Sequence, residues 1–203
     1  MVLRAGRPGP NGVLYPGTCR NGLPEGRSAR TWRAHARGVI TVNDALQGRH
    51  QWDLAESVGD FLIQRADGWP AYHLAAAVDD AATEMTHVVR GYDLLLCTPP
   101  QVHLTRALGA RSPQYAHLPL ACSPDGRKLS KVNAAAPIDD AQPSRALLAA
   151  LTFLQQEPPL PLQQASPFEI LDWARQHWYP RNLSGVAQAQ APDVPVAPAS
   201  EQR

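Results

Sequence analysis

The feature that most constrains the fold is a strand–helix–strand pattern between residues 86 and 120. Thr86–Gly91 is a short β-branched run that ends in glycine. The helix predicted over 98–108 has Thr98 as its N-cap, followed by two prolines and then a glutamine, and it stops at Gly109. Tyr115–Leu120 is the next strand-like run. This spacing predicts a βαβ unit, in which the two strands are parallel neighbours in one sheet.

Ligands of such sheets bind at the carboxyl ends of the strands. Those ends carry Arg90 after the first strand and Ser123–Lys131 after the second. We call residues 123–131 the signature loop and expect it, together with Arg90, on the ligand side of the sheet.

Upstream of this unit, β-branched and apolar residues predict two further strands, over 39–42 and 60–65. Tyr72–Val78 is also apolar. It is either a buried strand that ends at Asp79-Asp80 or, because of its alanines, a helix.

After Lys131, apolar residues recur at helical spacing. They predict helices over 144–155 and 166–178, with Ser144 and Ser166 as N-caps. From residue 184 onward the chain is alanine, proline, glutamine and valine without periodicity, so a disordered tail is expected. The expected parts are an irregular segment over 1–38, a sheet domain over 39–133, a helical region over 134–183 and the tail over 184–203.

Charge is concentrated at the start of the chain. Residues 1–38, the basic arm, hold seven arginines against one acid, Glu25, whereas the whole chain of 203 residues has a net charge of only +1. Such an arm suits a phosphate backbone, or it is simply a solvated terminus. The three cysteines form no C-x-x-C pair and the first residues have no targeting character, which favours the cytoplasm. No apolar run approaches the ~20 residues that cross a bilayer, so no membrane partner is expected.

The signature loop carries the clearest chemistry. Its Pro-Asp-Gly start predicts a tight turn, after which Lys128 and Lys131 stand three residues apart. Lysine ammonium groups beside a nucleotide triphosphate stabilise the charge that develops on the phosphates during attack at the α-phosphorus. Taken alone, K-x-x-K is a weak signal, and a solvated loop that happens to carry two lysines explains it better.

The residues around the loop resemble the class I glutamyl- and glutaminyl-tRNA synthetases. Matching blocks occur in the family's order and spacing: Asp60-Phe61, Arg65 to Gly68, Tyr72 to Ala75, Val78 to Asp80, Thr86 to Asp93, Thr98 to Gln101, His117 to Leu120, and Asp125 to Lys131. The resemblance implies an α/β fold, with the C-terminal half of a Rossmann-type parallel-sheet nucleotide-binding domain followed by a small helical region. It makes 39–133 the second half of the catalytic domain.

Within the family, two features resemble the glutamyl-Q tRNA(Asp) synthetase branch. Tyr15 to Arg20 is similar to the end of that branch's zinc segment, where a C-x-C pair, a tyrosine and a cysteine bind the metal. This resemblance makes 1–38 a remnant of the zinc and acceptor-binding insertion. Only 72 residues follow Lys131, which leaves no room for a large anticodon-binding domain. Members of this branch attach glutamate to the queuosine of tRNA(Asp).

The resemblance also implies roles for individual residues. Tyr72 and Arg90 would contact L-glutamate, Lys131 would contact ATP with its magnesium, and Lys128 and Ser130 would complete the catalytic loop. Two of these residues have a structural alternative. Tyr72 could pack in the core, and Arg90 could form a salt bridge to Asp79, Asp80 or Asp93.

The sequence departs from the family pattern in several places. None of its seven histidines begins the H-x-G-H element that holds ATP, and the C-x-C half of the zinc site is absent, leaving Tyr15 and Cys19 as two ligands of four. We therefore expect no stable zinc site and no activity from the 203 residues alone. The chain is then a tRNA-binding remnant, or an incomplete gene model of an enzyme that is a monomer in the family. A fragment with an uncovered sheet edge is expected to self-associate.

One smaller departure concerns the backbone. Glu84 stands where the family usually has glycine, and it would be strained if the position requires a positive φ. A regulator that binds nucleotide without tRNA would need another phosphate loop. Neither G-x-x-x-x-G-K-[ST] nor G-x-G-x-x-G is present.

Overall fold

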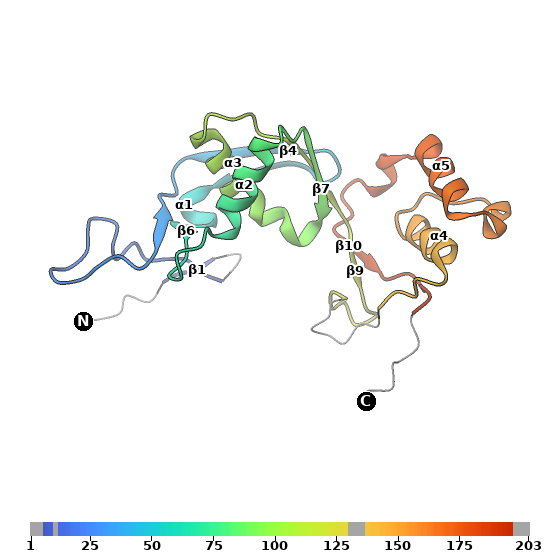
Figure 1. Cartoon of the computed structure of the whole chain (residues 1–203), viewed down its shortest axis with the longest axis horizontal. Coiled ribbons are helices and arrows are strands. Elements are labelled where there is room, and N and C mark those ends of the chain that lie inside the picture. Colours follow the sequence, from blue (N-terminus) through green and yellow to red (C-terminus); the bar gives the residue numbers. More distant parts are fainter. Residues whose placement is uncertain (1–5, 10–11, 130–136, 197–203) are drawn as a thin grey trace. The chain divides into compact units, whose positions relative to one another are not determined.

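The computed structural model describes residues 6–9, 12–129 and 137–196 (Figure 1). The chain folds as two compact units, an N-terminal unit of residues 1–89 and 94–116 and a C-terminal unit of residues 90–93 and 117–203. In the described ranges no helix is long and apolar enough to cross a membrane.

The N-terminal unit is built on short strands and hairpins. Its strands before the βαβ unit are β1 (Pro8–Gly9), β2 (Gly12–Val13), β3 (Trp32–Ala34), β4 (Val39–Asp44), β5 (Gly48–Asp53) and β6 (Phe61–Gln64). β4 and β5 form an antiparallel hairpin in which Val39 pairs with Asp53 and Asp44 with Gly48. Gly48 has φ +80°, and the Asp44 carboxylate accepts hydrogen bonds from the amides of Leu46 and Gln47. These two residues close the turn.

Three helices complete this unit: α1 (Leu54–Ser57), α2 (Tyr72–Ala82) and α3 (Thr98–Ala107). Residues 72–78 are therefore helical. The alternative of a buried strand is wrong, because the alanine-rich run has high helix propensity. Asp79 and Asp80 lie inside α2 and do not end a strand. Thr98 is not the N-cap of α3 as predicted; Cys97 occupies that position and Thr98 begins the helix.

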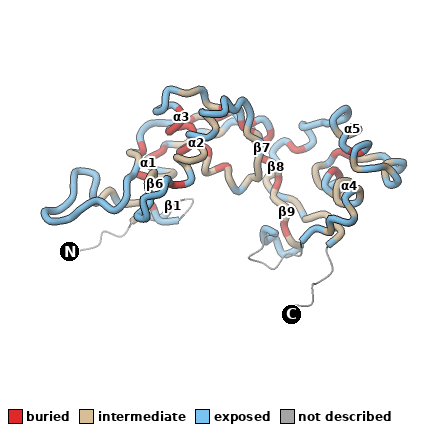
Figure 2. The backbone as a smooth tube through the Cα atoms, viewed as in Figure 1, coloured by how far each residue is buried: buried red, intermediate tan, exposed pale blue. Residues whose placement is uncertain are grey.

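The core of this unit lies around α3. Ile40 and Val42 point inward from β4 and pack with Leu54, Val102 and Tyr115. A second cluster joins Phe61, Ala77 and Leu104 from β6, α2 and α3. Most of α3 is buried, as its red trace in Figure 2 shows. The helix that the sequence placed between the two strands therefore forms the centre of the unit.

The predicted βαβ unit is confirmed. β7 (His87–Gly91) and β8 (Gln114–Leu118) are neighbours in one sheet, and α3 lies between them in sequence. At their starts, the Gln114 amide donates to the Thr86 carbonyl at 2.9 Å. Near their ends, Arg90 contacts His117. The strands therefore run in the same direction. A 3₁₀ segment, η1 (Tyr92–Cys97), leads from β7 into α3.

The C-terminal unit combines one parallel strand pair with short helices. β9 (Leu120–Cys122) pairs with β10 (Gln188–Gln190), and the helical segments are α4 (Pro143–Phe153), η3 (Leu160–Gln164), α5 (Pro167–His177) and η4 (Pro180–Leu183). Leu151, Ile170 and Leu183 are buried. The predicted helical region is thus present after the signature loop.

The two predicted serine caps have different outcomes. Ser166 caps α5, and Glu169 completes a capping box by accepting from the Ser166 amide at 2.8 Å. Ser144 is not a cap: Gln142 precedes α4, and the Ser144 hydroxyl donates to the Ala165 carbonyl at 2.9 Å. The second contact joins residues 21 positions apart, which local sequence reasoning does not detect.

Both terminal segments carry more structure than was predicted. Within the expected tail, Gln188–Gln190 form β10. Within the expected irregular arm, Trp32–Ala34 form β3, which pairs with β6. In each case a distant strand provides the backbone hydrogen bonds, and composition alone gives no sign of that partner.

Candidate functional site

Arg90 stands near the end of β7, on the side of the βαβ unit predicted to bind ligands. Its Nε donates a hydrogen bond to Nε2 of His117, at 3.0 Å. His117 lies on β8 at a fully buried position of the strand's alternating pattern. The end of β7 is therefore joined by side chains to the next strand.

Asp93 follows three residues after Arg90 and forms an ion pair with Lys128 of the signature loop. Gly91 makes room for this arrangement. A Cβ at position 91 would lie 2.7 Å from Oδ1 of Asp93 and 3.4 Å from Cδ2 of Leu120. A side chain there would displace the carboxylate that holds the loop.

The described part of the signature loop folds back on β9. The Leu129 amide donates to the Ala121 carbonyl at 2.9 Å, and the Ser123 amide donates to the Arg127 carbonyl at 2.8 Å. Gly126 has φ +81°, as the predicted Pro-Asp-Gly turn requires. Hydrogen bonds from the Ser123 hydroxyl and then from Arg127 lower the pKa of Asp125. Lys128 is thus presented from a closed turn, whereas Ser130 and Lys131 lie outside the described residues.

Tyr72, the other residue predicted to contact glutamate, belongs to the N-terminal unit. It stands at the start of α2, 54% exposed, and lines a pocket of about 550 Å³ together with Tyr15, Arg33 and Asp60. Core packing, the structural alternative for Tyr72, does not fit this exposure. Arg90 belongs to the C-terminal unit, so the two predicted glutamate contacts come from different units.

Asp60 fixes the basic arm to this pocket. The carboxylate is 5% exposed and accepts from the Ala36 amide at 3.0 Å and from Nε of Arg20 at 2.8 Å. Its backbone carbonyl accepts from Arg33, whose guanidinium lies 4.1 Å from the centre of the Tyr15 ring. Burial alone would raise the pKa of Asp60, but the hydrogen bonds from Arg20 and Ala36 outweigh it and lower that pKa. Part of the arm is therefore ordered by one buried acid.

The predicted zinc ligands lie in the same arm. The Tyr15 hydroxyl accepts from the Cys19 amide at 2.9 Å, and Cys19 is exposed. Structural zinc takes four ligands. Over the described ranges, no three His, Cys, Asp or Glu side chains gather closely enough to hold a metal. Among the described residues, Tyr15 and Cys19 therefore supply two of the four ligands that structural zinc takes.

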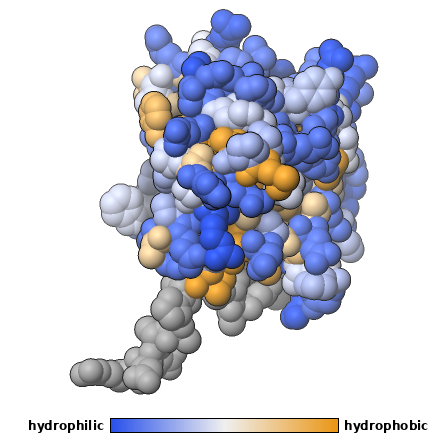
Figure 3. Space-filling view, turned by 90° about the vertical axis from the view of Figure 1, so that its right-hand side faces the viewer, coloured by the Kyte–Doolittle hydropathy of each residue, from blue (hydrophilic) through white to orange (hydrophobic). Residues whose placement is uncertain are grey.

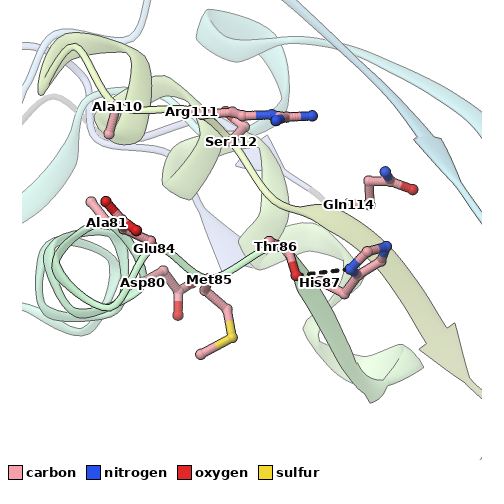
Figure 4. A pocket seen from close by; sticks show the side chains of 10 residues that line it. All are labelled: Asp80, Ala81, Glu84, Met85, Thr86, His87, Ala110, Arg111, Ser112 and Gln114. Carbon is pink, nitrogen blue, oxygen red and sulfur yellow. Dashed lines mark hydrogen bonds between the residues drawn. The ribbon is translucent and has the colours of Figure 1, made fainter.

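A second pocket of the N-terminal unit, of about 600 Å³, was not foreseen from the sequence (Figure 4). It lies beside the amino ends of β7 and β8, and its wall includes Asp80, Glu84, Arg111 and His87. Glu84 has φ +50°, which shows that this position does require a left-handed backbone. A non-glycine residue there costs on the order of 1–2 kcal/mol.

Sequence reasoning missed three residues that organise these sites: Asp60, Asp93 and His117. In the sequence, Asp93 stood out only as part of a motif and as a partner of Arg90, and His117 only as part of a motif. The only sequence signal for the burial of His117 was its position two residues after Tyr115 in β8, because alternate residues of a strand face the same side. Nothing local in the sequence links Asp60 to Arg20 or Asp93 to Lys128, because the partners are 40 and 35 residues apart.

Residues 25–147 match the family of class I tRNA synthetases (E and Q), catalytic domain. This match covers more than half of the chain. The chain belongs to this family. The expected α/β fold, with a parallel sheet and a helical C-terminal region, is confirmed by the structure and by its neighbours.

Within this family, the chain is similar to relatives that share one name. It is 51% identical over 188 residues to the glutamyl-Q tRNA(Asp) synthetase of Aromatoleum aromaticum, covering 93% of this chain and 60% of that protein. It is 45% identical over 184 residues to the protein of the same name from Thiobacillus denitrificans, covering 90% and 61%. The resemblance to the glutamyl-Q branch is therefore confirmed, and this class I synthetase chain spans about 60% of the length of these curated relatives.

A solved structure shows a related fold. A glutamate tRNA ligase from Elizabethkingia meningosepticum, crystallised with its amino acid, aligns with a TM-score of 0.55 and 25% identity. The alignment covers 78% of this chain and 36% of the ligase.

Proposed function

We propose that the protein takes part in the ATP-dependent activation of L-glutamate and its transfer to the queuosine of tRNA(Asp). The observation that carries this proposal is the 51% identity to the Aromatoleum aromaticum glutamyl-Q tRNA(Asp) synthetase. A match of 188 residues in a chain of 203 necessarily includes Tyr72, Arg90 and the signature loop.

In this proposal the glutamate carboxylate pairs bidentately with Arg90, and Tyr72 donates its hydroxyl to the amino acid. The carboxylate held by Arg90 is that of the side chain; an oxygen of the α-carboxylate attacks the α-phosphorus of magnesium-bound ATP, and pyrophosphate leaves. A queuosine hydroxyl then attacks the glutamyl carbonyl, and AMP leaves. Lys131 stabilises the charge that builds on the phosphates, while Lys128 and Ser130 shape the loop around it.

The parts of the chain divide this work. We propose that the 39–133 segment carries the reaction, that the basic arm over 1–38 faces the tRNA as a remnant of the zinc segment, and that 134–183 supports the loop. Residues 184–203 add no chemistry. The cytoplasm supplies both ATP and tRNA, so it is the compartment that fits the reaction.

The test is a fused protein: this chain joined to the part of the Aromatoleum aromaticum relative that the 188-residue match leaves uncovered. Radiolabelled L-glutamate, ATP and tRNA(Asp) are supplied. We expect label to enter tRNA(Asp) that contains queuosine and not tRNA(Asp) that lacks it. Incorporation independent of queuosine, or incorporation of glutamine in place of glutamate, would contradict the proposal.

A second candidate is tRNA binding without catalysis. It is favoured by the excess of arginine in the arm, which suits a phosphate backbone. Under either candidate, the 203 residues alone should show no glutamate-dependent exchange of ATP with pyrophosphate. Exchange above that of a Lys131→Ala control would remove the second candidate.

A further inference from the structure

The hydrogen bond between Arg90 and His117 determines the state of the histidine. A guanidinium group has N–H donors and no acceptor. Since Nε of Arg90 lies 3.0 Å from Nε2 of His117, that ring nitrogen must be the acceptor. The proton of the ring then sits on Nδ1, and the imidazole is neutral. A fully buried neutral ring thus faces the one cation that is proposed to bind glutamate.

We propose that His117 is the positioning residue that sets the plane of the Arg90 guanidinium for the carboxylate of the amino acid. The inference rests on the proposed function. A neutral acceptor orients the guanidinium and leaves its positive charge uncompensated. A carboxylate partner would orient the group and also compensate that charge. Because Nε donates to His117, a bidentate carboxylate is met by the two terminal amino groups of Arg90.

The neighbouring contacts support this assignment. Asp93, the nearest acid along the chain, forms its ion pair with Lys128. Gly91 permits that geometry, since a Cβ there would meet the Asp93 carboxylate at 2.7 Å. At this end of the sheet, Asp93 thus pairs with the signature loop, and Arg90 donates to the ring of His117.

The experiment uses the 203-residue chain with ¹⁵N labelling and three variants. His117→Gln keeps an acceptor near the position of Nε2, and His117→Phe removes it. His87→Gln is the matched control, because His87 lies on the adjacent strand with an exposed ring that contacts Thr86. Imidazole nitrogen shifts report the tautomer of His117. The Nε–H signal of Arg90 reports the hydrogen bond to His117, and it is identified by its absence from the Arg90→Lys variant. L-glutamate is then titrated into each protein to measure its affinity.

We expect a neutral His117 protonated on Nδ1, and an Arg90 Nε–H signal that moves in His117→Phe and is largely kept in His117→Gln. The apparent Kd for L-glutamate should rise at least about tenfold in His117→Phe, as loss of one hydrogen bond to a charged group predicts. It should stay within about threefold in His117→Gln and in His87→Gln.

Two results would overturn the inference: a His117 ring protonated on Nε2, or glutamate binding by His117→Phe equal to that of the unaltered chain. If His117→Phe does not fold, two measurements still test the proposal. They are the tautomer of His117 in the unaltered chain and the affinity of His117→Gln for L-glutamate. An Arg90 signal that depends on His117, in a chain that takes up no L-glutamate, would overturn the role of His117 in positioning Arg90 for the amino acid. The proposed function fails separately, if the fused protein transfers no glutamate to tRNA(Asp).

Discussion

The basic arm and the signature loop are both cationic, and in each an aspartate from elsewhere in the chain holds a cation. The two aspartates differ in burial. Asp60, which holds the arm through Arg20, is 5% exposed, whereas Asp93, which holds the loop through Lys128, is 34% exposed. Asp60 also accepts from the Ala36 backbone amide. The arm is therefore anchored by a buried network, and the loop by an ion pair that water reaches.

This difference separates structural charge from charge available to a ligand. Removing an acceptor from a buried donor leaves that donor unsatisfied, which costs about 1–3 kcal/mol. An exposed ion pair contributes only about 0.2–1 kcal/mol, so a phosphate can compete for its lysine. Arg20 and Arg33 thus serve the fold, whereas we propose that Lys128 exchanges Asp93 for a nucleotide phosphate.

The largest effect is expected in the loop. In the fused protein, Lys131→Ala should lower kcat for glutamate activation on the order of 10²–10³, because one electrostatic contact made in the transition state is lost. The KM for glutamate should change little. Pyrophosphate exchange measures both constants. A change confined to KM would assign Lys131 to substrate binding.

In the arm, Asp60→Ala should reduce the free energy of unfolding by about 2–3 kcal/mol, since it leaves the buried Ala36 amide without its acceptor. Urea denaturation of the full chain measures the loss. Asp93→Ala is the matched control and should cost much less. Equal losses for the two variants would erase the proposed distinction between the arm and the loop.

The same carboxylate should make stability depend on pH. The folded-state pKa of Asp60 is lowered, because hydrogen bonds from Arg20 and Ala36 outweigh its burial. The stabilisation that Asp60 adds to the folded state is therefore complete above its unfolded-state pKa of about 3.9. It is lost as the pH falls through the lower folded-state pKa. Urea midpoints between pH 6 and pH 2.5 should decrease less steeply in Asp60→Asn. A variant curve parallel to the parent curve would show that Asp60 does not titrate in this way.

A smaller effect concerns nucleic acid. Replacing the exposed Arg27, Arg30, Arg33 and Arg37 by alanine should flatten the salt dependence of tRNA binding, by roughly 0.9 log units for each duplex phosphate no longer neutralised. Mobility shifts at two salt concentrations measure the slope. Restoring Arg33 in the quadruple variant shows how much of the effect comes from its contact with Asp60 and how much from contact with phosphate. Arg175→Ala, at an exposed position on α5, is the control. An unchanged slope would make the arm a solvated terminus.

The smallest effect should come from the loop's own ion pair. A double-mutant cycle of Asp93→Asn and Lys128→Met should give a coupling free energy of about 0.2–1 kcal/mol, as exposed pairs do. Thermal and urea unfolding of the four proteins provide the cycle. A coupling well above this range would show that Asp93 binds Lys128 too firmly for exchange with a phosphate.

What the sequence could predict follows from the range of each interaction. The Pro-Asp-Gly turn and the cap at Ser166 depend on neighbours within a few residues, and both are confirmed. The βαβ unit is confirmed as well, because the order strand, helix, strand itself favours pairing of the two strands. For residues 72–78 the sequence left a choice between strand and helix, because an apolar run of this length suits either. Only the high helix propensity of alanine favours the helix. β10 and β3 were missed, since each forms only with a strand far away in the sequence.

The candidate site divides in the same way. Motif resemblance assigned Arg90, Tyr72 and the lysines to roles that remain proposals, and it did not assign the residues that hold them. His117, Asp93 and Asp60 act through partners at least 24 residues away. Chemistry-bearing residues can be read from a motif, whereas the contacts that orient them depend on the folded chain.

Several exposed apolar side chains of the C-terminal unit have no assigned role. Leu160, Phe168 and Leu171 are more than half exposed. Figure 3 shows apolar groups on one face, with hydrophilic groups between them. Scattered exposure of this kind is normal for a protein surface. The expected self-association of the chain therefore remains a prediction.

The pairing of β9 with β10 has a consequence for the order in which the protein is made. The strand that leads into the signature loop is flanked by residues synthesised 66 or more positions later: the Leu120 amide donates to the Ala187 carbonyl at 3.0 Å, and the Ala191 amide to the Cys122 carbonyl at 2.7 Å. On the ribosome, chains grow at roughly 5–20 residues per second and fold from the N-terminus. The base of the loop is therefore completed last, after most of the chain has already emerged.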